Sequence, residues 1–446
     1  MVTSVTRRVE ESQSLPNIYV SLKFQAMPAS PQPESALPFV LRVPFIAMLI
    51  VLADVAALHL DFRQPFIGYG IGGAFLLWVA SRPNWRQFVL VALAAAMIAF
   101  FGVRPQIGDD DTTLLVQWVG VLGSGSLLFL CCKAVWEPWG ARNATLRILL
   151  PACVLTFLVL AGVYSLNMAS YLHAKTFDLY TLVFDGTLGL QPSFACGRLL
   201  ASRAWIFPLV KITYEAIVLA MAAFYATFMA RRQKPIWELI ELLFAAAMVG
   251  YLFFSVFPVT GPRYAFATYF PATPIPNSIL TGLHLERIPV SWLVPRNGVP
   301  SLHFSWALLI WWNTRTLPRW ARFAALALVL ATAFDTLATG EHYLFDLVVA
   351  IPFSLGMQAL MIRTVEFRNR QRWLPALCGG ALFLGWLVLA RFGLPLLLHS
   401  RLLSWSLVLA SSTISLVWAF KLPALIPEMQ PAPAANAKAM AVASAG

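Results

Sequence analysis

His342 and Asp346 have the spacing and the chemistry of a catalytic pair. They lie four residues apart, where an apolar stretch follows Gly340-Glu341-His342-Tyr343. Side chains with this spacing share one face of a helix, and a carboxylate beside an imidazole can fix its tautomer and raise its basicity. The pair therefore predicts a histidine nucleophile oriented by Asp346. The alternative is a pair that only stabilises the start of a helix, where carboxylates are favoured.

His303 stands in a second polar cluster, Pro300-Ser301-Leu302-His303. Ser301 is a candidate N-cap, so the free backbone N–H groups of the turn that follows would point toward a bound phosphate. A lone histidine here could equally be an interfacial or capping residue. Two histidines at the ends of two apolar stretches instead favour chemistry in which one imidazole attacks phosphorus and the other protonates the leaving alkoxide.

A third cluster, Gly261-Pro262-Arg263-Tyr264, supplies a cation. A guanidinium can hold an anionic group through two parallel hydrogen bonds, so Arg263 is the candidate phosphate-binding residue together with Ser301. Contact with lipid headgroups is the alternative for Arg263. Supporting roles around the site are predicted for Tyr264, Arg296, Asp335 and Tyr343.

Together these residues describe a phosphoryl-transfer site that uses no metal and no other cofactor. Metal binding is the rival chemistry, because two histidines and one aspartate could hold zinc. However, the chain contains neither an HExxH motif nor a cysteine–histidine cluster. We therefore predict an enzyme that works with side chains alone.

The segments that carry the three clusters are predicted to cross a membrane. The chain is 59% hydrophobic and 12% charged, against about 45–50% and about 25% in soluble domains. The composition predicts an all-α polytopic membrane protein. A net charge of +12 could indicate nucleic acid, but lysine and arginine also concentrate in the cytoplasmic loops of membrane proteins. Nucleic acid is therefore not an expected partner.

About twelve transmembrane helices are predicted from the apolar stretches between charged or Pro/Gly-rich breaks. They lie near residues 43–60, 65–81, 87–103, 113–132, 146–167, 205–229, 238–258, 300–316, 320–340, 342–364, 375–396 and 401–421. With the N-terminus inside, 21 of the 32 lysines and arginines fall on the inner side. The positive-inside rule then predicts cytoplasmic termini and places all three polar clusters on the outer face.

The predicted spans divide the chain into five parts. They are a disordered cytoplasmic arm (1–37), accessory N-terminal helices (38–145), a six-helix catalytic core (146–365), two C-terminal helices (366–421) and a disordered tail (422–446). The core has two long outer loops, 168–204 and 259–299. The first contains Asp178 and Asp185 among apolar residues, a mixture that suits a helix lying in the membrane interface.

The order of the clusters resembles the type-2 phosphatidic acid phosphatase superfamily. An arginine follows one span, Pro-Ser-x-His opens the next, and His-x-x-x-Asp opens the span after the following one. Within that superfamily, Pro-Ser-Leu-His and Gly-x-His-Tyr-x-x-Asp are closer to the inositol phosphorylceramide synthase (aureobasidin-sensitive) branch and its bacterial relatives. The resemblance covers residues 146–365, and the segment Asp178 to Ser193 also resembles a segment of those relatives.

The resemblance implies a role for each residue of the site. His342 would form a phosphohistidine, Asp346 would orient it, His303 would act as general acid and then base, and Arg263 would bind phosphate. The phosphatase branch has Ser-Arg ahead of the final histidine, where this chain has Asp335-Thr336, and a glycine where it has Leu302. It also has an upstream lysine without a match here. These departures favour transfer between a lipid and an alcohol.

The predicted function is transfer of a phosphoryl headgroup from a lipid to an alcohol at the outer face of an inner (plasma) membrane. The partners are then a lipid substrate, an alcohol or water acceptor and the surrounding membrane lipids. A lipid phosphate phosphatase, with water as acceptor, is the nearest alternative. Twelve spans with both termini inside would also suit a secondary transporter, but no internal repeat relates the two halves and the polar clusters lie at one face.

Overall fold

The structure is a computed structural model that describes residues 65–102, 111–230, 237–280, 282, 284–362, 366 and 368–422. The predicted arm (1–37), the first predicted span (43–60) and the predicted tail beyond its first residue lie outside these residues. Each of the other predicted spans overlaps a helix, and the described part of the chain has one two-stranded pairing as its only sheet. The fold is therefore an all-α polytopic membrane protein, as predicted.

Seven helices of the described residues are long and apolar enough to cross a membrane, or up to eight if a bent pair counts as one span. The bent pair is α8 (Phe207–Glu215) with α9 (Ile217–Ala230), which meet at an angle of 64°. Three of the predicted spans are shorter helices: α2 (Pro65–Ala80), α3 (Trp85–Gly102) and α13 (Leu302–Asn313). With 16 and 12 residues, α2 and α13 are shorter than the roughly 17–25 residues of a helix that crosses a membrane, and α3, with 18, is at the lower end of that range.

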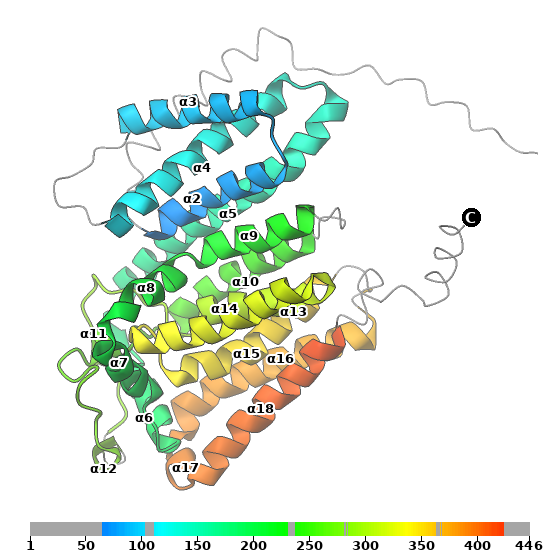
Figure 1. Cartoon of the computed structure of the whole chain (residues 1–446). Helices are drawn as coiled ribbons and strands as arrows, with labels where there is room; N and C mark the ends of the chain where they lie inside the picture. The colour runs from blue at the N-terminus through cyan, green and yellow to red at the C-terminus, as the bar shows by residue number, and fades with distance from the viewer. Residues whose placement is uncertain are drawn as a thin grey trace, which may run out of the picture.

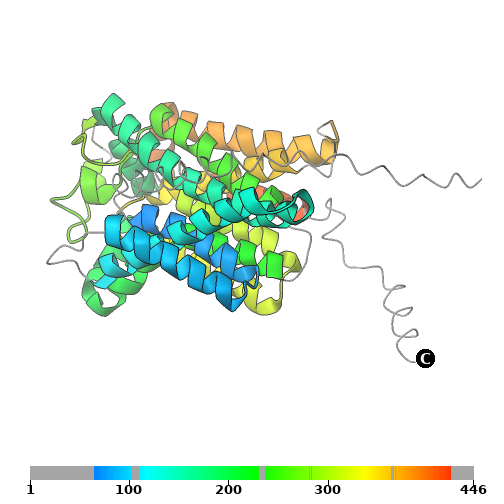
Figure 2. The same ribbon diagram turned by 90° about the horizontal axis from the view of Figure 1, so that it is seen from above.

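The helices run side by side as a stack from α3 to α18 (Figure 1), and the view from above shows the same alignment (Figure 2). The N-terminal part consists of α2, α3, α4 (Asp111–Trp136) and α5 (Trp139–Leu172). The predicted boundary between accessory helices and core, at residues 145 and 146, falls inside α5. The first turn of α2 brings Phe66 to His303 of the core, with ring centroids 5.3 Å apart.

Four helices carry the predicted site: α10 (Trp237–Val256), α13, α14 (Arg319–Ala338) and α15 (Leu344–Met361). A 3₁₀ turn, Thr314–Thr316, follows α13. In α15, 78% of the most apolar window is buried inside the protein, against 28–44% in the other candidate spans. The helix that begins just after His342 is therefore the central helix of the bundle.

Short elements gather at the end of the bundle where α13 and α15 begin (Figure 1). They are β1 (Lys175–Thr176), α6 (Asp178–Thr187), α7 (Pro192–Ser202), a 3₁₀ turn (Ala204–Ile206), α11 (Pro262–Ala265), α12 (Asn277–Leu280) and β2 (Ile288–Pro289), and β1 pairs antiparallel with β2. As predicted for the first outer loop, neither α6 nor α7 is long enough to span a membrane. Most of α6 is buried within the protein.

The C-terminal helices support α6 from the side opposite the site. They are α16 (Arg370–Val388), a π-helical turn (Leu389–Gly393), α17 (Leu394–Leu398) and α18 (Arg401–Lys421). The Trp386 ring packs edge-on against Phe184 of α6, with centroids 5.4 Å apart, and the Trp405 indole donates to the Leu188 carbonyl over 3.1 Å. These helices, for which the sequence offered no role, therefore hold α6 in place.

Candidate active site

His342 and Asp346 form a fully buried pair. The His342 Nδ1 atom lies 3.1 Å from Asp346 Oδ2, and neither side chain is exposed. The same Oδ2 accepts the backbone N–H of Tyr343 over 3.0 Å. A carboxylate beside Nδ1 holds the proton there, so the Nε2 lone pair is left free to act as a nucleophile.

The backbone around this pair differs from the prediction in one respect. The two residues were expected on one helix face, but α15 begins at Leu344 and His342 lies in the connection before it. The reason is that Tyr343 is extended, with φ −92° and ψ 164°, and forms the N-cap. Asp346, in the first turn, therefore reaches back across the cap to His342. The contact between the carboxylate and the imidazole, on which the orienting role depends, is still made.

Two glycines set the path of the chain into His342. Gly340 has φ +72° and follows the last turn of α14, a conformation that commonly ends helices. Gly261 has φ +109°, and a Cβ atom there would lie 2.4 Å from the Glu341 carbonyl oxygen. The first and third clusters thus pack backbone against backbone, and the Arg263 N–H donates to the Gly340 carbonyl over 3.1 Å.

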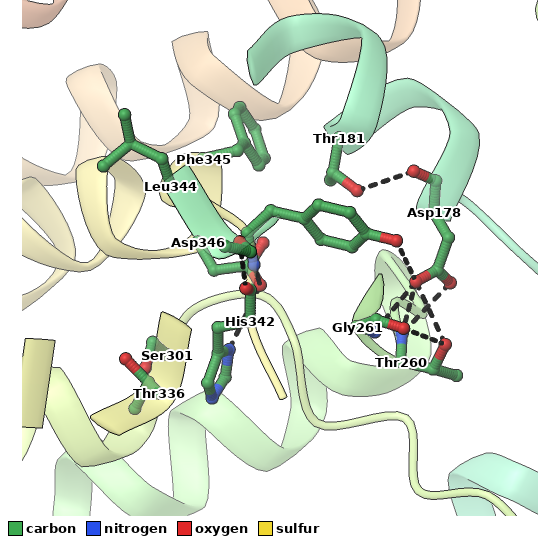
Figure 3. Close-up of polar contacts among 12 residues, drawn as sticks. Asp178, Thr181, Thr260, Gly261, Ser301, Thr336, His342, Leu344, Phe345 and Asp346 are labelled. Atoms are coloured by element: carbon green, nitrogen blue, oxygen red, sulfur yellow. Dashed lines mark hydrogen bonds and ion pairs between the residues drawn. The ribbon is translucent and has the colours of Figure 1, made fainter. Parts of the chain in front are cut away.

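Asp178 and Asp185 of α6 hold the connection in place from the other side. Asp185 accepts the first two backbone N–H groups of α15, from Leu344 at 3.0 Å and Phe345 at 3.1 Å. Asp178 accepts the Tyr343 hydroxyl at 3.0 Å and the Gly261 N–H at 2.8 Å (Figure 3). Burial raises the pKa of both carboxyl groups, and that of Asp185 by more.

The sequence placed these two aspartates in an interfacial helix but did not connect them to the site. The signal was their spacing of seven residues, which puts them on one face of α6 two turns apart. Ser193, at the start of α7, adds a third contact, because its hydroxyl donates to the His342 carbonyl over 2.8 Å.

His303 is surrounded by aromatic rings rather than by hydrogen-bonding groups. Its imidazole stacks on Tyr214, with centroids 4.2 Å apart and planes 12° apart, and lies edge-on to Phe66 at 5.3 Å and Trp306 at 5.8 Å. The side chain is nearly buried. The rings fix its orientation, as Asp346 fixes that of His342, and the two imidazoles are close enough to interact electrostatically.

Ser301 stands at the N-cap of α13, as predicted, but its hydroxyl makes no capping hydrogen bond. Its backbone N–H donates to the Asp346 carbonyl over 3.3 Å, which ties the start of α13 to the first turn of α15. Figure 3 shows Ser301 and Thr336 beside the His342 ring. The Ser301 hydroxyl is buried and has no hydrogen-bond partner among the described residues.

Arg263 is paired with an acidic residue to which the sequence assigned no role. Its Nη1 atom lies 2.9 Å from Glu341 Oε1, and the Tyr264 hydroxyl donates to the same oxygen over 3.0 Å. Burial raises the pKa of Glu341, while the guanidinium opposes this shift. Arg263 and Tyr264 thus lie beside the candidate nucleophile, joined to it through Glu341.

Two of the predicted supporting residues have other roles. All five N–H donors of Arg296 are used by backbone carbonyls of His173, Val290, Ser291 and Val294, so this buried guanidinium supports the outer loop and has none left for phosphate. Asp335 is buried in α14, and its side chain bonds to neither histidine. Tyr343 does support the site, through its hydrogen bond to Asp178.

Buried polar atoms without a partner among the described residues gather around the two histidines. They include Nε2 of His303, Nε2 of His342, Oγ of Ser301, Oδ1 of Asp346 and Oδ1 of Asn297. Buried polar atoms are nearly always hydrogen-bonded, and exceptions call for a functional explanation. Here the unpaired atoms include the two ring nitrogens that the predicted chemistry would use.

A cavity of about 1210 Å³ adjoins the cluster. Its lining includes Tyr214, Arg263, Glu341 and Asn297, and it continues along apolar and aromatic side chains of α5, α7 and α8. Several of these, such as Tyr164, Tyr171 and Phe207, are exposed on the outside of the bundle. No group of three or more histidine, cysteine or acidic side chains suited to a metal ion occurs among the described residues.

The fold and the site define an all-α polytopic membrane protein whose histidine–aspartate pair opens its central helix. Residues 179–360 match the model of the PAP2 superfamily. This match supports the type-2 phosphatidic acid phosphatase superfamily, whose members are lipid phosphatases or phosphotransferases. It covers the chain from α6 to the last turn of α15, inside the predicted core of 146–365. No curated protein and no solved structure matches the chain.

Proposed function

We propose that the protein is a lipid phosphotransferase that moves a phosphoryl headgroup from a lipid to an alcohol through a phosphohistidine at His342. The observation that carries the proposal is the buried His342–Asp346 pair, whose Nε2 has no partner, together with the unpaired Nε2 of His303, an imidazole that interacts electrostatically with His342. The match of this segment to the PAP2 superfamily supports it.

In the first half of the reaction, His342 Nε2 attacks phosphorus and the bond to the lipid alkoxide breaks. His303 donates a proton to that alkoxide, which leaves as an alcohol such as a diacylglycerol. Asp346 stabilises the charged imidazole that forms. Arg263 and the Ser301 hydroxyl bind the non-bridging oxygens of the phosphate, where negative charge increases in the transition state.

In the second half, the acceptor hydroxyl gives its proton to His303 and its oxygen attacks the phosphohistidine. The N–P bond breaks and the lone pair returns to His342 Nε2. An alcohol acceptor yields a new phosphodiester, and water yields the monophosphate of the headgroup. No step requires a metal, because both proton transfers and both attacks are assigned to side chains.

The cavity supports a lipid substrate. Its lining includes Arg263 and Glu341, next to His342 in the chain, and many apolar and aromatic side chains, among them exposed tyrosines of α5. A headgroup at Arg263 would thus have its chains directed toward the surface that faces lipid. Aromatic rings of this kind are enriched at membrane–water interfaces.

The test is turnover of a labelled phospholipid by purified protein, followed by acid treatment to release phosphate bound to histidine. We expect an acid-labile label on the wild-type protein and its loss, together with all turnover, in His342→Ala. Retained turnover in that variant would exclude the mechanism. Supplying the lipid with and without a polyol such as inositol separates transfer from the phosphatase alternative, since only transfer yields a new phosphodiester that contains the polyol, whereas hydrolysis yields the headgroup monophosphate.

A further inference from the structure

Glu341 lies directly beside Arg263, the residue proposed to bind the substrate phosphate. Its carboxylate bonds to the Arg263 guanidinium over 2.9 Å and to the Tyr264 hydroxyl over 3.0 Å. The Glu341 side chain is only 10% exposed, whereas that of Arg263 is 47% exposed and lines the cavity. Any phosphate that binds Arg263 therefore lies beside a fixed carboxylate, in the residue directly before His342.

The charge of the cavity is balanced. Among the described lining residues, the basic side chains are Lys211 and Arg263, and the acidic ones are Glu215 and Glu341. Arg296 adds no cation, because its donors all bond to backbone carbonyls. The two basic and two acidic side chains balance, so a phosphate bound here meets no excess of positive charge.

Lipid phosphates come in two charge states that this arrangement would distinguish. A phosphate monoester carries about −1.5 to −2 charges near neutral pH, because its second pKa is about 6, and a diester carries only one. The second charge of a monoester would approach the Glu341 carboxylate, whose side chain is only 10% exposed and where like charges are weakly screened. A diester avoids this repulsion.

We propose that Glu341 is a specificity-determining residue that restricts the donor to lipid phosphodiesters. The proposal rests on the proposed function, since it presupposes that a lipid phosphate reacts at His342. In the bound complex Arg263 would hydrogen-bond to the carboxylate and to one phosphate oxygen together, which its planar fork of donors permits. Tyr264 keeps the carboxylate in place.

A matched pair of lipids tests the proposal. Phosphatidic acid and phosphatidylmethanol share their chains and differ in one methyl group and in charge. For each lipid, release of diacylglycerol gives kcat/KM in wild-type protein and in Glu341→Gln, which keeps the size of the side chain and an oxygen that accepts from Arg263. Glu215→Gln removes a carboxylate from the same cavity and leaves the Arg263–Glu341 pair intact.

We expect the wild-type protein to prefer phosphatidylmethanol by at least about tenfold, as a close like-charge contact predicts. Glu341→Gln should shift the ratio toward phosphatidic acid by about tenfold or more, and Glu215→Gln should change it by less than about threefold. An unchanged ratio in Glu341→Gln, or a wild-type preference for phosphatidic acid, overturns the proposal.

A second measurement uses the wild-type protein only and so does not depend on whether a variant folds. A long-chain alkylphosphonate and its monomethyl ester are compared as inhibitors of diacylglycerol release by the wild-type protein. The monoanionic ester should bind at least about tenfold more tightly, and equal or tighter binding of the dianion overturns the proposal. If selectivity fails while His342→Ala still abolishes turnover, phosphotransfer stands and the role of Glu341 does not. If neither lipid reacts in any variant, both are rejected.

Discussion

The two histidines are oriented by different means. Asp346 holds His342 through a hydrogen bond of 3.1 Å, whereas Tyr214 and Phe66 hold His303 by ring contacts. A carboxylate partner suits a nucleophile that must become positively charged. An aromatic environment suits a group that exchanges protons with the substrate, because no neighbouring side chain competes for its Nε2 atom.

Replacing Asp346 with asparagine tests the orienting role. The amide N–H₂ group would donate to Nδ1 and so favour the tautomer with its proton on Nε2, which cannot attack phosphorus. We expect kcat to fall by at least about 10²-fold, since the same change in a serine protease triad costs about 10⁴-fold. Because His342 Nδ1 and the Tyr343 N–H both contact the same Oδ2 atom, an amide N–H₂ group at that position leaves the Tyr343 N–H without this acceptor, and Tm is therefore measured beside kcat.

The control is Asp335→Asn, which changes a buried carboxyl group that bonds to neither histidine. It should lose far less activity than Asp346→Asn. Comparable losses in the two variants, in steady-state rates and in labelled phosphohistidine, would show that a general loss of structure explains both and that Asp346 has no special role.

Residue spacing predicts the local parts of this site and not its long-range parts. The His342–Asp346 pair follows from a separation of four residues. Arg263 could be proposed as a phosphate ligand, but its partner Glu341 lies 78 positions away and only the fold brings them together. The same holds for Phe66 and His303, because nothing in the sequence indicates that the first turn of α2 reaches α13.

At the scale of elements, α6 joins the two long loops, 168–204 and 259–299, to the central helix. It carries Asp178 and Asp185 toward the start of α15 and packs Phe184 against Trp386 of α16. The positions of the long helices could be predicted from apolar stretches of the sequence, because a helix that is buried in lipid must be apolar along most of its length. The short helix α6 was predicted as a helix in the membrane interface, but its burial within the protein and its contacts with α15 were not, since its partners are remote in sequence.

Trp386→Ala tests whether the C-terminal helices support the site through α6. Truncating a buried aromatic residue typically costs about 3–5 kcal/mol, and the loss would loosen the contact of α6 with α15. We expect a lower Tm and reduced kcat with little change in KM, measured in detergent. Trp320→Ala removes an indole of α14 that is 61% exposed and should change neither quantity much; equal effects would contradict the supporting role.

At the scale of the whole molecule, several buried carboxyl groups lie at one end of the bundle. Burial raises the pKa of Asp178, Asp185 and Glu341 above the ordinary value. The folded protein therefore keeps protons that the unfolded chain has already lost as the pH rises from about 4. Under these conditions the free energy of unfolding falls with increasing pH.

The expected result is a Tm that decreases between pH 5 and pH 8 for the wild-type protein. Asp185→Asn removes the group whose pKa is raised most among these three, so its Tm should depend less steeply on pH. The amide oxygen can accept one of the two N–H groups at the start of α15, and the other loses its acceptor, so the comparison rests on the slope of Tm with pH and not on its absolute value. A Tm that rises with pH in the wild-type protein, or parallel curves for the two proteins, would refute this assignment.

The charge distribution predicts which way the bundle faces. The site lies at the end opposite the connection between α15 and α16 (Figure 1), where arginines such as Arg370 and Arg372 are expected on the cytoplasmic side. In a cysteine-free background, Trp292→Cys should react with an impermeant maleimide on intact cells, and Glu366→Cys only after lysis. The reverse pattern would place the site on the inner face.

The hydrogen bonds of α6 have a consequence for the making of the protein. Asp178 and Asp185 bond to residues that follow them by 165 and 159 positions. At about 5–20 residues per second, a ribosome needs roughly 8–30 s to synthesise that interval. Because α6 does not cross the membrane, both carboxylates can remain hydrated while they wait. The active site is thus completed only when the last core helix has been inserted, so no earlier nascent chain can act on lipid.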